Sequence, residues 1–162
     1  MDALKSALAG QYFAALTMLQ QTIERCPDEV WLSGESPRLY WRIVYHSLYY
    51  TDLYLHPSPG DFTPWSGHDP EVPQLWNPPK VIEPYTQDQM SGYLKDLRGR
   101  VKGRLDALDL AEADCRFSYY KGFSRIDHQL VNLRHLGGHV GQLSEILMSR
   151  GVDTDWIGKR AR

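Results

Sequence analysis

Four stretches of this sequence repeat apolar residues at intervals of three and four, and this period constrains the fold more than any other feature. The stretches cover residues 4–26, 36–56, 86–110 and 124–150. Such spacing places the apolar side chains on one face of a helix, whereas a half-buried strand would alternate apolar and polar residues, and no segment does so convincingly. The pattern predicts an all-α protein, with a four-helix bundle as the simplest architecture.

The ends of the first two predicted helices are marked by prolines. Cys26-Pro27 ends the first helix. Ser36-Pro37 offers an N-cap followed by the residue best tolerated in a first helical turn, so we expect the second helix to begin there. It should run to His56-Pro57.

The last two helices carry capping signals. Thr86 stands three residues before Gln89 and Ser124 three residues before Asp127, which are the spacings at which a hydroxyl and a longer polar side chain cap each other's backbone amides. The third helix should end near residue 110, and Gly151 should stop the last one.

Residues 57–84 form the long break between the second and third helices. Prolines crowd this stretch, and Gly60 and Gly67 interrupt it further, so that neither helix nor central strand is plausible. Loops of this length in compact domains are functional or disordered. Because the loop has large apolar residues to bury, we expect a packed crossover or lid; these residues are Phe62, Trp65, Leu75 and Trp76.

Length and charge narrow the class of protein. A chain of 162 residues suits one domain, 1–162, because a core of this size buries roughly two-thirds of the unfolded surface. The formal net charge of −2 leaves no continuous basic stripe for a phosphate backbone, so nucleic acid is not an expected partner.

The sequence shows neither a secretory leader nor a membrane span. Residues 1–5 lack a basic region followed by an apolar one, and no apolar run approaches the roughly 20 residues that cross a bilayer. We therefore expect a cytoplasmic protein. Cys26 and Cys115 lack the spacing of a zinc knuckle or a redox pair, and are expected to be free thiols.

His135 and His139 are the strongest candidates for chemistry. Four residues apart on a helix, they point from one face with Cβ atoms about 5–6 Å apart, which suits two ligands of one metal ion. His46 replaces an apolar residue on the inward face of the second helix and is the natural third ligand. A hydrogen-bonded core role for each histidine stays open as the alternative.

Other catalytic patterns are missing. The run from His135 to His139 lacks the glutamate of the H-E-x-x-H peptidase motif, and no Glu-x-x-His pairs exist to build a carboxylate-bridged di-iron site. Gly137, Gly138 and Gly141 lie in mid-helix, where each costs around 1 kcal/mol relative to alanine. Close helix packing and room for a ligand over the metal are the two explanations.

The remaining polar candidates have less defined roles. Gln142, one turn beyond His139, could orient a ligand or a bound water. His128 lies about 10 Å along the axis from His135, too far for the same ion, so we expect a position at the rim or behind the ligands, or simple exposure. His56 stands at a helix end, where the dipole favours it, and His68 reaches a pocket only if its loop folds inward.

The sequence resembles the DinB-like family (DinB/YfiT type) of four-helix metalloproteins. The run His135-Leu136-Gly137-Gly138-His139-Val140-Gly141-Gln142 is similar to the family's H-x-x-x-H-x-G-Q motif, and His46 stands at its second-helix position. Residues 27–31 and Trp156 add to the likeness. The family often has a polar residue where Val140 stands, so no substrate contact is carried over.

The resemblance implies His46, His135 and His139 as ligands of one divalent ion, zinc, nickel or iron, in a homodimer. Some relatives are thiol-dependent transferases or isomerases. The expected function is therefore a metal-dependent enzyme, a transferase or hydrolase, that presents a low-molecular-weight thiol to a small electrophile, with Gln142 or a loop tyrosine positioning it. The alternatives are a noncatalytic bundle that binds a metal or small ligand in a stress response, and a purely structural dimer.

Overall fold

A computed structural model describes residues 2–78 and 83–159, and every regular element within them is helical. The all-α prediction is confirmed for this part of the chain. The elements are α1 (Asp2–Glu24), α2 (Asp28–Trp31), α3 (Tyr40–Tyr54), α4 (Gln87–Ala107) and α5 (Arg125–Met148), with short 3-10 turns η1 (Pro59–Asp61) and η2 (Ser118–Tyr120).

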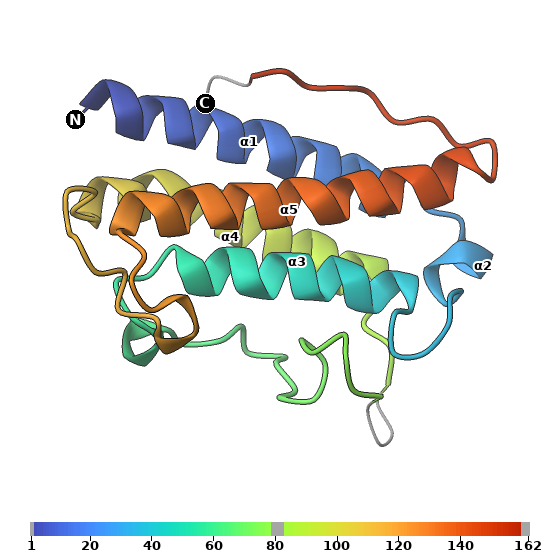
Figure 1. Cartoon of the computed structure of the whole chain (residues 1–162). Helices are drawn as coiled ribbons and strands as arrows, with labels where there is room; N and C mark the ends of the chain where they lie inside the picture. Colours follow the sequence, from blue (N-terminus) through green and yellow to red (C-terminus); the bar gives the residue numbers. More distant parts are fainter. Residues whose placement is uncertain (1, 79–82, 160–162) are drawn as a thin grey trace.

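The four long helices pack around a shared apolar core. Both α1 and α3 pack against α4 and α5, so each long helix has two principal neighbours (Figure 1). Each contributes a fully buried aliphatic side chain to the core: Leu16, Val44, Val101 and Leu143. Among the described residues, no helix is long and apolar enough to cross a membrane.

The segment between α3 and α4 runs back along α3, because these two helices point in the same direction (Figure 1). Residues 79–82 of this predicted loop lie outside the described residues. Val72 and Leu75 are buried in the apolar core, whereas Phe62 and Trp65 are half-buried. Trp76, however, is 61% exposed, and the prediction that it would be buried is wrong.

Two of the predicted helix starts are confirmed in detail. The Thr86 hydroxyl accepts from the Gln89 amide, and the Gln89 side chain accepts from the Thr86 amide at 2.8 Å. Ser124 and Asp127 form the same reciprocal pair at the start of α5. These caps depend only on neighbours three residues apart, and for this reason the sequence reveals them.

The predicted start of the second long helix is wrong. Ser36 and Pro37 are joined by a cis peptide bond and belong to a turn in which the Arg38 amide donates to the Glu35 carbonyl at 2.7 Å. The Tyr40 amide donates to Ser33 at 3.0 Å, so these amides are satisfied outside the helix and α3 begins only at Tyr40. The third helix also ends earlier than expected, at Ala107.

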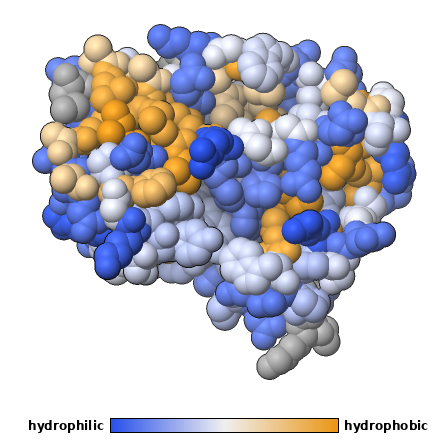
Figure 2. All heavy atoms as spheres, viewed as in Figure 1, coloured by the Kyte–Doolittle hydropathy of each residue, from blue (hydrophilic) through white to orange (hydrophobic). Residues whose placement is uncertain are grey.

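One residue of the apolar stripe on α5 faces solvent. Leu130 is 53% exposed, and Figure 2 shows hydrophobic side chains gathered on the surface over the first turns of α1 and α5. Both cysteines are buried and free, as predicted. Burial raises the pKa of Cys26 to about 11, so its thiol is protonated at neutral pH and is a weak nucleophile.

Candidate metal centre

Three histidines from two helices converge inside the molecule. His46 on α3 faces His135 and His139 on α5, and one ligand nitrogen from each ring lies within 4.8 Å of the other two. The three ring centroids are 4.7–4.8 Å apart. His135 and His139 lie one helical turn apart on the same face of α5. Because α3 packs directly on α5, His46 lies opposite this pair.

The hydrogen bonds of these rings fix which nitrogens face inward. A carbonyl can only accept, so His46 carries its proton on Nδ1, which donates to the Pro73 carbonyl at 2.5 Å. His139 Nδ1 likewise donates to the Gln142 side-chain oxygen at 3.0 Å. Nε2 of His46 and of His139 is thereby unprotonated and can bind a metal, as in metal sites where an outer partner sets the tautomer.

The third ring completes the cluster from α5. His46 Nε2 and His135 Nε2 are 2.8 Å apart, so His135 Nε2 donates to His46 when no ion is bound. His135 Nδ1 is buried and has no hydrogen-bond partner among the described residues. Ligand nitrogens at about 2.0–2.1 Å from a tetrahedral ion lie about 3.3 Å from one another, a separation within the range that this cluster spans.

Burial keeps the three rings neutral at physiological pH. It lowers the pKa of His46 to about 3 and that of His135 to about 4, with the neighbouring histidines adding to the effect. Burial also lowers the pKa of His139, which the Gln142 bond partly offsets and the Arg38 charge reinforces. Because metals bind neutral imidazole, protons compete little for this cluster near pH 7.

A buried arginine holds the loop that orients His46. Arg42, one turn before His46 on α3, is fully buried and donates to the carbonyls of Glu71, Val72 and Gln74 at 3.0, 3.1 and 2.6 Å. These carbonyls flank Pro73, the acceptor of the His46 proton. Sequence reasoning missed both residues, although a charged residue on an otherwise apolar helical face was a signal.

A large cavity opens over the histidines. It has a volume of about 930 Å³ and is lined by His46, His135, His139 and Gln142 together with side chains of the two long loops. A second cavity of about 410 Å³ adjoins it and shares His135, His139, Gln142 and Tyr120. The cluster is therefore accessible to small molecules, and Tyr120 is a loop tyrosine of the expected kind.

The remaining histidines lie outside the cluster. His128 is fully buried between aromatic rings, so the expectation of a rim or exposed position is wrong. His56 lies just beyond the end of α3, where its Nδ1 donates to the Asp52 carbonyl at 2.8 Å. His68 lies on the loop against α3, with its Nδ1 2.7 Å from the Tyr45 hydroxyl, and does not line either cavity.

Close packing within the chain does not explain the glycines of α5. A Cβ atom added at Gly137, Gly138 or Gly141 would meet nothing within 4 Å among the described residues. Gly138 lines the smaller cavity beside His135 and His139. Of the two explanations, room for a ligand fits Gly138, and packing against other helices of the chain fits none of the three.

Comparisons with models of protein families, with curated proteins and with solved structures found no match to this chain.

Proposed function

We propose that this protein is a metal-dependent enzyme whose ion is held by His46, His135 and His139. The observation that carries the proposal is the convergence of three neutral imidazoles, two of them with outward hydrogen bonds that leave Nε2 unprotonated, beneath a cavity large enough for a small substrate. A core histidine needs no such convergence.

The donor set suits catalysis better than a structural role. Structural zinc sites are closed by four protein ligands, whereas three histidines leave a position for water or substrate. A divalent ion bound there supplies a Lewis acid that lowers the pKa of a coordinated water or thiol. The chain's own part is to hold the three rings, to fix their tautomers through Pro73 and Gln142, and to surround the reactants with the apolar walls of the cavity.

The substrate class within this proposal is a low-molecular-weight thiol that attacks a small electrophile. Membership of the DinB-like family, a four-helix bundle with a crossover loop, and a homodimer belong to the same proposal. The support for it is the motif from His135 to Gln142, together with the arrangement of the long helices and the return of the loop along α3.

Metal content is the first test. Protein purified without an affinity tag should contain close to one zinc, nickel or iron per chain by elemental analysis, and His139→Ala should contain almost none. His128→Phe is the matched control, because it removes another buried histidine from α5 without touching the cluster. Equal metal content in wild type and His139→Ala would exclude the site.

Turnover separates an enzyme from a noncatalytic metal binder. The metal-loaded protein should accelerate the reaction of small thiols with an electrophile such as 1-chloro-2,4-dinitrobenzene, and His46→Ala should abolish the acceleration. The same activity in His46→Ala would rule out the proposed mechanism. A metal-loaded wild type that accelerates none of the thiol reactions tested would favour the binding role.

A further inference from the structure

The charges that line the two cavities are all of one sign. Apart from the histidines, the charged residues in their walls are Arg38 in the larger cavity and Arg134 in the smaller one. No aspartate or glutamate among the described residues lines either wall, although the chain has 20 acidic residues and a net negative charge. The site that holds the histidines is thus an electropositive region of an acidic protein.

Arg38 has its charge available to a ligand. Its side chain is exposed at the turn before α3, and within the described residues it forms no ion pair. It lines the same cavity as His46, His135 and His139. Glu35 shares a neighbouring cavity with Arg38 and is the acidic group best placed to weaken this field.

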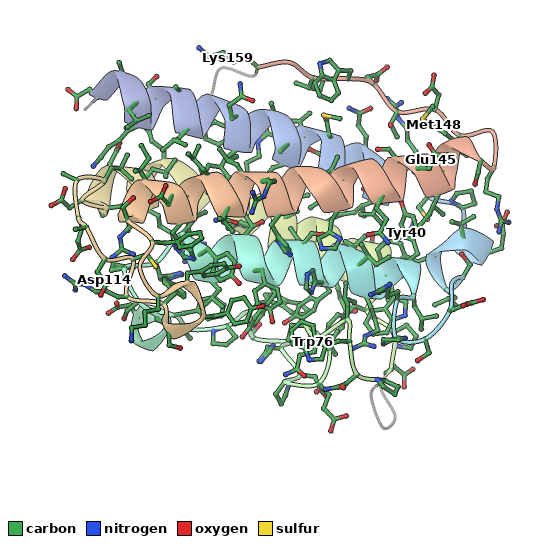
Figure 3. All side chains as sticks on the ribbon, in the orientation of Figure 1. Tyr40, Trp76, Asp114, Glu145, Met148 and Lys159 are labelled. Atoms are coloured by element: carbon green, nitrogen blue, oxygen red, sulfur yellow. The ribbon has the colours of Figure 1, made fainter. Side chains whose placement is uncertain are left out.

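Aromatic rings make up much of the remaining wall of the larger cavity. These come from α3 and from both long loops, and they are Tyr50, Tyr54, Trp76, Phe117, Tyr119 and Tyr120. Trp76 is 61% exposed and Tyr119 is 88% exposed, and Figure 3 shows Trp76 on the loop that runs beneath α3. Large aromatic side chains left in water on two loops at one cavity suit a flat apolar ligand that stacks between them.

We propose that the cavity over the histidine cluster binds a small organic anion with a flat apolar or aromatic body, its acidic group directed to Arg38. The assignment rests on the proposed function in that it names the substrate class of the same site. The aromatic walls take the apolar body, and the arginine and the histidine-bound ion attract the acidic group. A cation would meet only like charge there, and a neutral ligand would leave Arg38 unused.

The test uses two dyes that share one body and differ in charge. 1-Anilinonaphthalene-8-sulfonate carries a sulfonate, and N-phenyl-1-naphthylamine is its neutral counterpart. Fluorescence titration of metal-free wild type should give a Kd about three- to tenfold lower for the sulfonate. Arg38→Gln should remove this preference while leaving the neutral dye unaffected, and Glu35→Gln should enlarge it.

Arg150→Gln is the matched control, because it removes the same charge from the exposed end of α5, away from both cavities. It should leave both affinities unchanged. The proposal is overturned if the two dyes bind wild type equally, if Arg38→Gln weakens both dyes alike, or if Arg150→Gln acts as strongly as Arg38→Gln.

Added zinc separates this proposal from the metal site itself. Zinc should strengthen binding of the sulfonate dye further and leave the neutral dye unchanged, and His139→Ala should lose that zinc effect. If the metal-free preference for the anion is present but zinc changes nothing, the anion site stands and the metal proposal fails.

Discussion

Helix α5 turns histidines toward the inside of the molecule in two places, and the two environments differ in what lies opposite the ring. His128, in the first turns, is enclosed by Tyr54, Phe117 and Tyr120 at centroid distances of 4.7, 4.3 and 5.0 Å. Neither of its ring nitrogens has a hydrogen-bond partner within the described residues. Two to three turns later, His135 and His139 face another imidazole. The rings lie on similar faces of α5, but His128 is fully buried, whereas His135 and His139 are half-buried, border the cavities and have a nitrogen donor opposite them on a second helix.

The two regions therefore differ in their expected effects on ion binding and on the stability of the protein. At the cluster, three neutral rings bring nitrogen donors close enough together to bind one ion. In the aromatic enclosure, no hydrogen bond from the described part of the chain offsets the desolvation of His128, and an unpaired buried polar group costs stability. The comparison therefore predicts that His128 lowers the stability of the protein, whereas the cluster supports binding.

The largest expected effect concerns acid stability. Burial, with a smaller contribution from the Arg125 charge, lowers the pKa of His128 from 6.5 to about 4. Between pH 6.5 and pH 4, His128 is protonated in the unfolded chain but not in the folded chain, so the free energy of unfolding falls as pH decreases. The loss should reach about 3 kcal/mol at pH 4 relative to pH 7.

His128→Phe keeps the ring shape and removes the titration. In urea unfolding with a chelator present, this variant should be at least as stable as wild type at pH 7 and should lose about 3 kcal/mol less on going to pH 4. The other buried histidines titrate in both proteins and cancel in the comparison. Equal losses of stability in the two proteins between pH 7 and pH 4 would show that burial does not lower the pKa of His128.

The second effect tests the outer hydrogen bond of the cluster. Gln142→Ala removes the acceptor that holds His139 Nδ1–H, and loss of such a partner typically weakens metal affinity by about 10–100-fold. Competition of the protein with a chromogenic chelator for zinc measures this loss. His128→Phe should bind zinc as wild type does, and an equal loss in both variants would remove the distinction between the two regions.

The smallest effect concerns the glycines between the ligands. Gly137→Ala should raise the free energy of unfolding by about 0.8–1 kcal/mol, because alanine is the better helix former and its methyl group has open space. Gly151→Ala should have the opposite sign, since Gly151 has a φ of +79°. A fall in stability for Gly137→Ala would mean that this face is covered, for instance by a second copy of the chain.

The sequence predicts those parts of the fold that local chemistry decides. Helical period and the capping pairs at Thr86 and Ser124 involve residues within one or two turns of each other, and they place the starts of α4 and α5 correctly. The predicted start of α3 was wrong because Pro37 lies in a turn, where the Arg38 amide donates to the Glu35 carbonyl and the Tyr40 amide to the Ser33 carbonyl. A Ser-Pro pair is compatible both with such a turn and with the first turn of a helix, so the sequence alone does not distinguish them.

The site was predictable only where its residues lie on helices. His46, His135 and His139 follow from spacing and facing, whereas Pro73 and Arg38 reach the cluster through loop paths that no periodicity encodes. His128 was misplaced for the same reason. The loop before α5 folds Phe117 and Tyr120 over a ring that the helix alone would leave near the surface.

The clamp of Arg42 on the carbonyls around Pro73 makes ion loading and loop order reciprocal. An ion bound to Nε2 of His46 would keep the proton of this ring on Nδ1, and it would thereby favour the loop conformation in which the Pro73 carbonyl accepts that proton. By linkage, the ordered loop strengthens ion binding by the same factor. Protease cleavage near residues 71–75 should therefore slow when zinc is added. A stretch of chain without regular structure would thus report on the occupancy of a centre to which it contributes no ligand.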